Sequence, residues 1–269
     1  MLRTIATIAA ALVFTVAVEA GGLSTPRAYS NRILIPAAIS AEGANGTTFR
    51  SDIRITNQSD RPQRVQLDWL PRDGAPGPAF VTIVEILPYQ TLASDDFVHE
   101  VMNRGGLGAI LVNGIDETGA ADPDARLHAT ARVWTPQPGS EGTSSQSFSP
   151  IPLRDVVNDK LFILGHRRNE QYRTNVGIVN LDSGVHTFLV TVSGETPTLV
   201  PEEYRVSVPG FAMVQFPVTG AQQNQLRVEI QEDVAPGGPR LTLWTAYASS
   251  VDNVTGDGWT TAGVDRGEK

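Results

Sequence analysis

The chain has 269 residues, 41% of them hydrophobic, so it carries enough apolar side chain to fill a core and is not disordered throughout. It contains no cysteine, which excludes a disulfide framework, a thiolate metal site and a cysteine nucleophile. The formal net charge of −8 argues against nucleic acid as a partner, because neutralising phosphates requires a basic surface.

The first twenty residues are typical of a signal peptide. Arg3 precedes an apolar run from Ile5 to Val18, and the small residues that follow end in an A-x-A-like pattern at Ala20. The run has about 14 residues, fewer than the ~20 that a membrane-spanning helix needs. We therefore expect a signal peptide over residues 1–20 and an exported mature chain without a membrane span. An uncleaved anchor is the weaker alternative.

After this segment the chain alternates apolar and polar residues over short stretches separated by turn residues. This pattern is typical of β-strands with one buried face. In residues 49–57 the apolar face carries Phe49, Ile53 and Ile55, and residues 65–69 alternate in the same way after a turn. The two stretches predict a β-hairpin.

A second copy of this hairpin follows at an offset of 123 positions, with its apolar face preserved: residues 172–180 and 188–192 correspond to residues 49–57 and 65–69. A unit of about 110 residues repeated twice fits the size of an immunoglobulin-like sandwich. We predict an all-β protein with two tandem immunoglobulin-like β-sandwich domains after the N-terminal signal peptide. The predicted segments are the signal peptide (1–20), domain 1 (31–153), domain 2 (160–263) and a disordered tail (264–269).

One short helix is predicted in the first domain. Ser94 offers an N-cap, and Asp95 and Asp96 stand in the first turn, where negative charge suits the helix dipole. Gly105 ends the pattern. We expect this helix to close one end of the first sandwich.

The sequence motifs of common enzymes are missing. Asn103 stands where a zinc-protease motif beginning at His99 would need its second histidine, and the other histidines are not at metal-ligand spacing. The chain has no G-x-S-x-G elbow, P-loop or G-x-G-x-x-G phosphate cradle. We therefore predict a protein that is not an enzyme and uses no cofactor. A hydrolase whose site is assembled from loops is an alternative.

Arginine and tryptophan residues are the candidates for binding. Arg50 and Arg173 recur at matching positions and could line a ligand-binding sheet, but pairing with acidic neighbours is the interpretation that we favour. Trp134 and Trp259 are candidates for stacking on sugars, as is Trp244. Packing in the core or at the sandwich rim is the favoured alternative for these tryptophans.

The segment 252–258 gathers side-chain oxygen atoms and turn-forming glycines. Asp252, Asn253 and Asp257 are a candidate calcium site, because hard cations take six to eight oxygen ligands. The spacing departs from the EF-hand loop, since Val254 occupies its third position and no glutamate stands at its twelfth. We favour a turn between strands and expect no metal.

The strands that end in Asn57 and Asn180, together with residues 247–257, resemble uncharacterised secreted bacterial proteins built from tandem immunoglobulin-like sandwiches. The resemblance extends loosely over residues 33–263 and implies a fold and an exported location, without a reaction. A bacterial source also fits the near absence of lysine, because arginine codons are rich in G and C.

Residues 55–69 resemble the corresponding hairpin of periplasmic pilus chaperones, which have two immunoglobulin-like domains and donate a strand to a subunit. This weaker resemblance implies an edge strand with alternating apolar residues, for which Leu107, Ala109 and Leu111 are the candidates. The acidic charge and the internal repeat count against it.

The leading hypothesis is an exported, non-enzymatic binding or structural module of the bacterial envelope or exterior, either secreted or periplasmic. Its expected partner is an envelope or extracellular protein or polysaccharide. The alternatives are a pilus-chaperone-like protein that acts by strand donation and the loop-built hydrolase.

Overall fold

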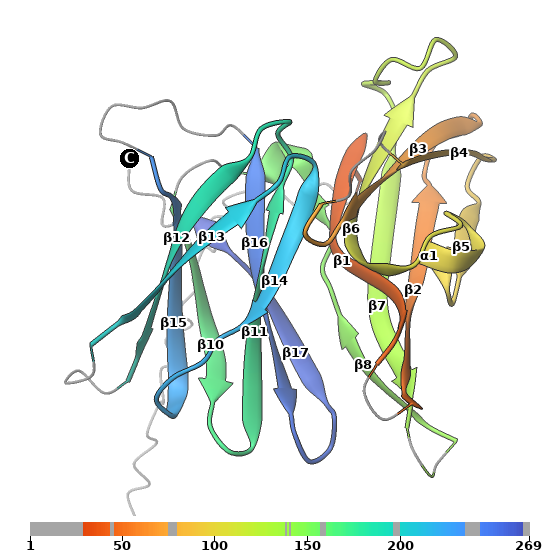
Figure 1. Cartoon of the computed structure of the whole chain (residues 1–269). Helices are drawn as coiled ribbons and strands as arrows, with labels where there is room; N and C mark the ends of the chain where they lie inside the picture. The colour runs from red at the N-terminus through yellow and green to blue at the C-terminus, as the bar shows by residue number, and fades with distance from the viewer. Residues whose placement is uncertain are drawn as a thin grey trace, which may run out of the picture.

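Antiparallel strands are the dominant element of the computed structural model (Figure 1). The structure describes residues 29–265 apart from 44–45, 75–79, 138, 140, 157–159, 196–199 and 235–242. The strands form two β-sandwiches, the first from β1 to β9 and the second from β10 to β18. The all-β prediction is confirmed. The predicted signal peptide, residues 1–20, lies outside the described residues. No helix in the described part of the chain is long and apolar enough to span a membrane.

The first sandwich contains two sheets. Sheet 1 has the strand order β5-β2-β7-β8, and sheet 2 has the order β4-β3-β6-β1-β9. The last residues of β1 also pair with β2, which joins the sheets at one corner. The elements are β1 (Arg32–Glu42), β2 (Thr48–Asn57), β3 (Gln63–Pro71), β4 (Phe80–Ile86), β5 (Thr91–Ser94), α1 (Phe97–Glu100), β6 (Gly106–Ile115), β7 (Leu127–Pro136), β8 (Thr143–Ser147) and β9 (Ile151–Pro152).

The second sandwich pairs its strands in the same order. Sheet 3 has the order β14-β11-β16-β17, and sheet 4 has the order β13-β12-β15-β10-β18, so β1 corresponds to β10 and each later strand follows in register. The elements are β10 (Leu161–Arg168), β11 (Tyr172–Asn180), β12 (His186–Gly194), β13 (Glu202–Val208), β14 (Ala212–Pro217), β15 (Gln223–Glu232), β16 (Trp244–Asp252), β17 (Gly258–Ala262) and β18 (Val264–Asp265).

Each sandwich encloses its own apolar core. The residues predicted on the inner face of the hairpins are buried there, because alternate side chains of a strand point to the same face. They are Ile53, Ile55, Val65, Leu67 and Trp69 in the first core and Val176, Ile178, Phe188, Val190 and Val192 in the second. Phe49 differs from this pattern, since it is only half-buried and lies where the two sandwiches meet.

The helix is shorter than the sequence predicts. α1 spans Phe97–Glu100 alone, and its N-cap is Asp96, whose side chain makes no capping hydrogen bond. Ser94 belongs to β5 and pairs with Ile53, so the chain cannot enter a helix before Asp96. Phe97 and Val98 are fully buried in the first core, and α1 therefore closes one end of the sandwich as expected.

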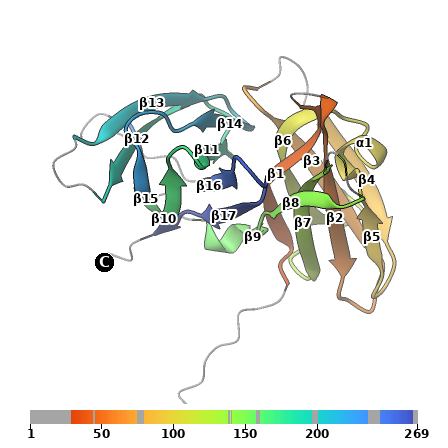
Figure 2. The ribbon, with the colours of Figure 1, turned by 90° about the horizontal axis from the view of Figure 1, so that it is seen from below.

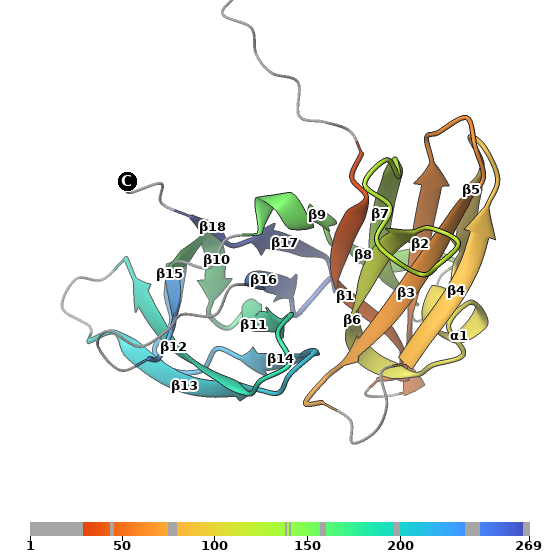
Figure 3. The ribbon, with the colours of Figure 1, turned by 90° about the horizontal axis from the view of Figure 1, so that it is seen from above.

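A third apolar cluster joins the two sandwiches face to face. Sheet 2 contributes Leu34, Leu70, Ala109 and Leu111, sheet 3 contributes Val179, Met213 and Tyr247, and the chain after β8 contributes Phe148 and Leu153. The Phe148 ring meets the Tyr247 ring edge-on, with centroids 5.4 Å apart. Gly177 makes room for this tyrosine, because a Cβ there would lie 2.2 Å from the Tyr247 ring. Figures 2 and 3 show the resulting stack of four sheets, in which the two sandwiches share a core in addition to their linker.

The two faces that would continue the stack are mostly polar. Val179, Met213 and Tyr247 of sheet 3 correspond in the pairing register to Thr56, Thr91 and Thr130 of sheet 1. Similarly, the sheet 2 residues Leu34, Leu70, Ala109 and Leu111 correspond to Phe162, Ser193, Arg227 and Glu229 of sheet 4. Polar outer faces are typical of the terminal units of repeat proteins. The face-to-face contact therefore ends after two sandwiches.

Two details correct the sequence predictions. The stretch with Leu107, Ala109 and Leu111, the edge-strand candidate under the weaker chaperone resemblance, lies in β6, which is a central strand between β3 and β1. Ala109 and Leu111 are covered by the second sandwich. Val264 and Asp265, predicted to begin a disordered tail, form β18 and pair with β10, while residues 266–269 lie outside the described residues.

Candidate functional site

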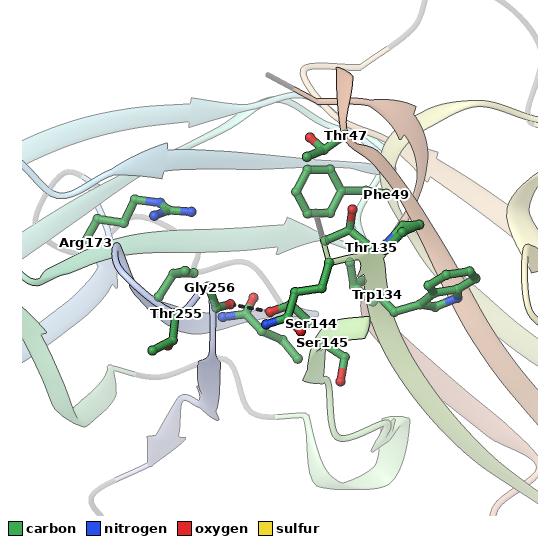
Figure 4. Close-up of a pocket in the computed structure, with 14 residues that line it drawn as sticks. Thr47, Phe49, Trp134, Thr135, Ser144, Ser145, Arg173, Thr255 and Gly256 are labelled. Atoms are coloured by element: carbon green, nitrogen blue, oxygen red, sulfur yellow. Dashed lines mark hydrogen bonds between the residues drawn. The ribbon is translucent and has the colours of Figure 1, made fainter. Parts of the chain in front are cut away.

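A cleft opens where the edges of the two sandwiches meet, between β2, β7 and β8 on one side and β11, β16 and the β16–β17 turn on the other (Figure 4). Its volume is about 210 Å³. Phe49, Val133 and Val251 provide apolar lining, and Ser144 and Gln146 are among its polar lining residues. The seam cleft, as we call it, therefore combines an apolar surface with hydrogen-bonding groups.

Hydrogen bonds between the sandwiches hold one wall of the seam cleft in place. The Ser144 hydroxyl donates to the Gly256 carbonyl at 2.7 Å, and the Gln146 amide donates to the Ser250 carbonyl at 2.9 Å. The Ser249 hydroxyl donates to Gln146 Oε1 at 3.0 Å. These bonds attach β8 of the first sandwich to the second, so the cleft wall is built before any ligand arrives.

Arg173 is the one charged residue among the described residues that line the seam cleft. Its Nη1 donates to Asn253 Oδ1 at 2.6 Å, and Figure 4 shows its side chain extending toward Phe49 across the cleft. The sequence predicted an acidic partner, whereas the observed partner is a neutral amide. Because no acidic side chain among the described residues pairs with Arg173, the guanidinium has further donors for an anionic ligand.

The three candidate calcium ligands build a turn. Asp252 Oδ1 accepts the backbone N–H groups of Val254 and Thr255 at 2.7 and 3.2 Å, and its Oδ2 accepts from Gln171 at 2.9 Å. These hydrogen bonds to the carboxylate hold the pKa of Asp252 below its usual range. The Asn253 oxygen accepts from Arg173, and the Asp257 carbonyl accepts from the Asp252 N–H. Among the described residues, no group of three His, Cys, Asp or Glu side chains is placed to hold a metal ion.

Trp134 and Arg50 form a pair on the outer face of sheet 1. They are register partners on β7 and β2, and the Arg50 guanidinium lies 5.5 Å from the centre of the Trp134 ring. Arg50 also faces Asp96, with Nε 3.6 Å from Oδ2, so its predicted acidic pairing is observed. The Trp134 indole donates to the Asp95 carbonyl at 2.8 Å and points away from Arg173 in Figure 4. Trp134 therefore lines the cleft without presenting its ring to it.

Trp259 lies over a buried histidine. Its ring stacks on His166 with centroids 5.9 Å apart, and its indole donates to the Gly165 carbonyl at 3.1 Å. His166 Nδ1 lies 2.8 Å from the Ser250 hydroxyl, but both residues are completely buried. A serine–histidine pair without access cannot reach a substrate, so this pair supports the packing of the second sandwich. Trp244, also considered for sugar stacking, is fully buried against Phe188.

Burial also changes the protonation of His166. Desolvation lowers the pKa of His166 to about 4, because the charged imidazolium would lie in the apolar interior. Its Nε2 has no hydrogen-bond partner among the described residues. The imidazole is therefore neutral at pH 7.

Comparisons with known proteins add no functional assignment. No family model matches the chain, and no curated protein matches it. Solved structures do match, among them vicilin from hazelnut, Corylus avellana, with 9% sequence identity, a TM-score of 0.19, and coverage of 80% of this chain and 76% of that chain. A TM-score of this size supports no inference about fold or function.

The structure brings some predicted residues together and separates others. Arg173 and Trp134, which are 39 positions apart in the sequence, both line the seam cleft, whereas Arg50 and Trp259 do not line it. Sequence reasoning missed Phe49, Ser144 and Gln146. Phe49 was assigned to the core by strand alternation, and a serine- and glycine-rich loop gave no sign that β8 would contact the second sandwich.

Proposed function

We propose that this protein is an exported, non-enzymatic binding or structural module whose ligand site is the seam cleft. The observation that supports this best is that both sandwiches line one cleft while a shared apolar core holds them together. A preformed concave site lowers the entropic cost of binding, since little has to be ordered when the ligand arrives.

The lining of the cleft suggests the chemistry of its ligand. Phe49, Val133 and Val251 suit an apolar or sugar-ring surface, and Ser144 and Gln146 can form hydrogen bonds at its edge. Arg173 suits a carboxylate, which a guanidinium can bind through two parallel hydrogen bonds. The ligand that fits is an acidic unit of an envelope or extracellular polysaccharide, or a protein segment that presents a carboxylate.

We also propose that each sandwich is immunoglobulin-like in architecture and that the two arose by duplication. Support comes from the size of the units, from their antiparallel sheet pairs and from the shared strand order. One difference is that β1 and β2 belong mainly to opposite sheets, whereas the first two strands of an immunoglobulin constant domain share a sheet. The likeness is therefore one of architecture.

A binding experiment with a matched pair of variants tests the proposed site. The purified chain is screened against a panel of acidic and neutral oligosaccharides and of peptides with free or amidated C-termini. Arg173→Gln should weaken binding of a carboxylate ligand at least about tenfold, the effect of losing roughly 1.4 kcal/mol from a charged hydrogen bond. Arg205→Gln is the control, because Arg205 is exposed on the second sandwich and pairs with Asp233 away from the cleft.

Three results would contradict the proposal. Equal binding by Arg173→Gln and the control would place the site elsewhere. Turnover of an ester, glycoside or peptide that one Ser, Asp or Glu substitution abolishes would favour the hydrolase alternative. Capture of a surface subunit through strand pairing would favour the chaperone alternative, although its candidate strand β6 is central.

A further inference from the structure

The exposed apolar side chains of the first sandwich are concentrated in one stretch. Among its described residues, the large hydrophobic side chains that are exposed are Val81 at 42%, Ile83 at 51%, Leu87 at 46% and Tyr89 at 70%. Val81 and Ile83 project from the outer face of β4, and the other two belong to the turn after it. These residues lie within nine positions of one another, unlike the scattered exposed hydrophobics of the second sandwich.

β4 is also an edge strand. It ends the order of sheet 2 and pairs only with β3 among the described strands, and Figure 3 shows it at the outer margin of the first sandwich. A free edge presents unpaired N–H and C=O groups to any other extended chain. Natural edges are usually blocked by lysine, proline, a bulge or a short length. β4 has seven residues, with no proline, glycine or lysine, and Glu85 as its single charge.

The corresponding strand of the second sandwich carries charges at the same places. In the shared pairing order, Val81 and Ile83 of β4 correspond to Glu203 and Arg205 of β13. Arg205 also forms an ion pair with Asp233, at 2.9 Å. The turn after the strand is alike in both sandwiches, since Tyr89 and Phe211 each have a positive φ, of 56° and 48°. The two sandwiches therefore differ in whether the edge strand is protected.

We propose that the β4 edge pairs with the β4 edge of a second copy of this chain. Pairing is antiparallel about a two-fold axis at Thr82, so that Thr82 faces the partner's Thr82. In that register Val81 lies opposite the partner's Ile83, and Ile83 lies opposite the partner's Val81. Val81 and Ile83 of each copy are then covered by an apolar residue of the other copy. Cross-strand pairs of β-branched residues of this kind stabilise sheets. An isologous contact of this kind closes as a dimer and leaves no β4 edge unpaired.

The charge pattern of β4 favours a second copy of this chain as the partner and an antiparallel arrangement of the two strands. The two Glu85 carboxylates lie three residues beyond the axis on opposite sides, about 20 Å apart along the strands. That separation exceeds the Debye length of about 8 Å, so they repel each other little. A parallel arrangement in register would place the two Glu85 side chains next to each other. Self-pairing also keeps a strand rich in β-branched residues out of contact with other chains.

The first test measures the oligomeric state of the full chain by light scattering after gel filtration. The wild type and Leu164→Arg should both be dimers at micromolar concentration, because Leu164 is exposed on β10 away from the β4 edge. Ile83→Arg, which introduces the residue found at the same place in β13, should raise the dimer dissociation constant at least tenfold. An unchanged circular dichroism spectrum and a cooperative thermal melt for Ile83→Arg show that it remains folded.

The second test uses the absence of cysteine from the chain. Ile83→Cys should cross-link to a dimer with a bismaleimide of about 8 Å reach, which spans diagonal neighbours on paired strands. Arg205→Cys, at the same place on β13, should stay monomeric on the gel. A monomeric wild type, a dimer that survives Ile83→Arg, or equal cross-linking at position 205 would each overturn the proposal. Binding of a foreign strand peptide by a monomeric wild type would overturn it in favour of another partner.

Discussion

Asn57 and Asn180, at corresponding positions of the two sandwiches, are fully buried and make the same pattern of hydrogen bonds to the backbone. Each side chain uses its amide group to satisfy three backbone carbonyls and its oxygen to accept one backbone N–H. The carbonyl partners are Arg61, Ile86 and Leu87 for Asn57 and Gly184, Val208 and Pro209 for Asn180, and the N–H donors are Ser59 and Asp182. Each asparagine thereby connects the turn of one hairpin to the end of the next strand.

Replacing either asparagine should therefore be costly. Asn57→Ala and Asn180→Ala should each lower the free energy of unfolding by about 2–4 kcal/mol, because several buried carbonyls lose their donor. Urea denaturation measures the change. Asn224→Ala, at an exposed position, is the control and should cost less than about 0.5 kcal/mol. A loss below about 1 kcal/mol in both buried variants would show that water replaces the amide.

The shared core predicts that the two sandwiches unfold together. The wild type should show one cooperative thermal transition. Combining Val179→Thr, Met213→Thr and Tyr247→Thr gives sheet 3 the side chains found at the corresponding positions of sheet 1. Because these substitutions remove much of the apolar contact, calorimetry should then resolve two transitions. Two transitions in the wild type, or one in the triple variant, would contradict this prediction.

The buried imidazole of His166 predicts a loss of stability in acid. Its pKa is lowered to about 4 in the folded chain, while an unfolded histidine titrates near pH 6.5. Between these values the unfolded chain binds the extra proton, so stability falls as pH drops from about 6.5 to 4, by roughly 3 kcal/mol. Urea denaturation across this pH range should show a shallower slope for His166→Gln than for the wild type or for His128→Gln. Equal slopes in all three proteins would refute the assignment.

A partly buried ion pair stabilises one loop of the second sandwich. The Arg168 guanidinium donates to both carboxylate oxygens of Glu202, at 2.7 and 2.8 Å, and also to the Ala221 carbonyl. Desolvation of Glu202 opposes ionisation, but the hydrogen bonds and charge of Arg168 prevail and lower the pKa of Glu202. Its stabilising contribution is present above its unfolded pKa and is lost as pH falls through the lowered folded value.

Glu202→Gln should therefore destabilise the chain by about 2–3 kcal/mol at pH 7, since it leaves a buried guanidinium without its counter-charge. Thermal melts at pH 7 measure the effect. Glu203→Gln, at the exposed neighbouring position, is the matched control and should change little. If both variants melt at the same temperature, the ion pair contributes no net stability.

The predictable parts of the fold are those that depend on neighbours in the sequence. Alternation placed Ile53, Ile55, Val65 and Leu67 on a buried face, and the structure confirms this, because successive side chains of a strand always point to opposite faces. The same rule misplaced Phe49, whose strand extends past the core to the seam. Alternation cannot show where along a strand the core ends.

Contacts between distant segments could not be predicted in this way. For Trp244 the sequence leaves core packing, rim packing and sugar stacking open, and the structure buries it fully because β16 is a central strand of sheet 3. The apolar residues of β6 are edge-strand candidates only under the chaperone resemblance, and they face residues of the second sandwich that lie about 70 to 140 positions later in the chain. Sequence alternation identifies an apolar face without identifying what covers it.

The sequence by itself therefore determined the all-β class, the hairpins and their inner faces, because these follow from side-chain period and turn chemistry. The tertiary structure decided which apolar faces meet, and thereby the four-sheet stack, the polar faces that end it and the seam cleft between the sandwiches. Those features depend on contacts between strands far apart in the chain. The free energy of such contacts comes from burial against a partner surface, which no local pattern specifies.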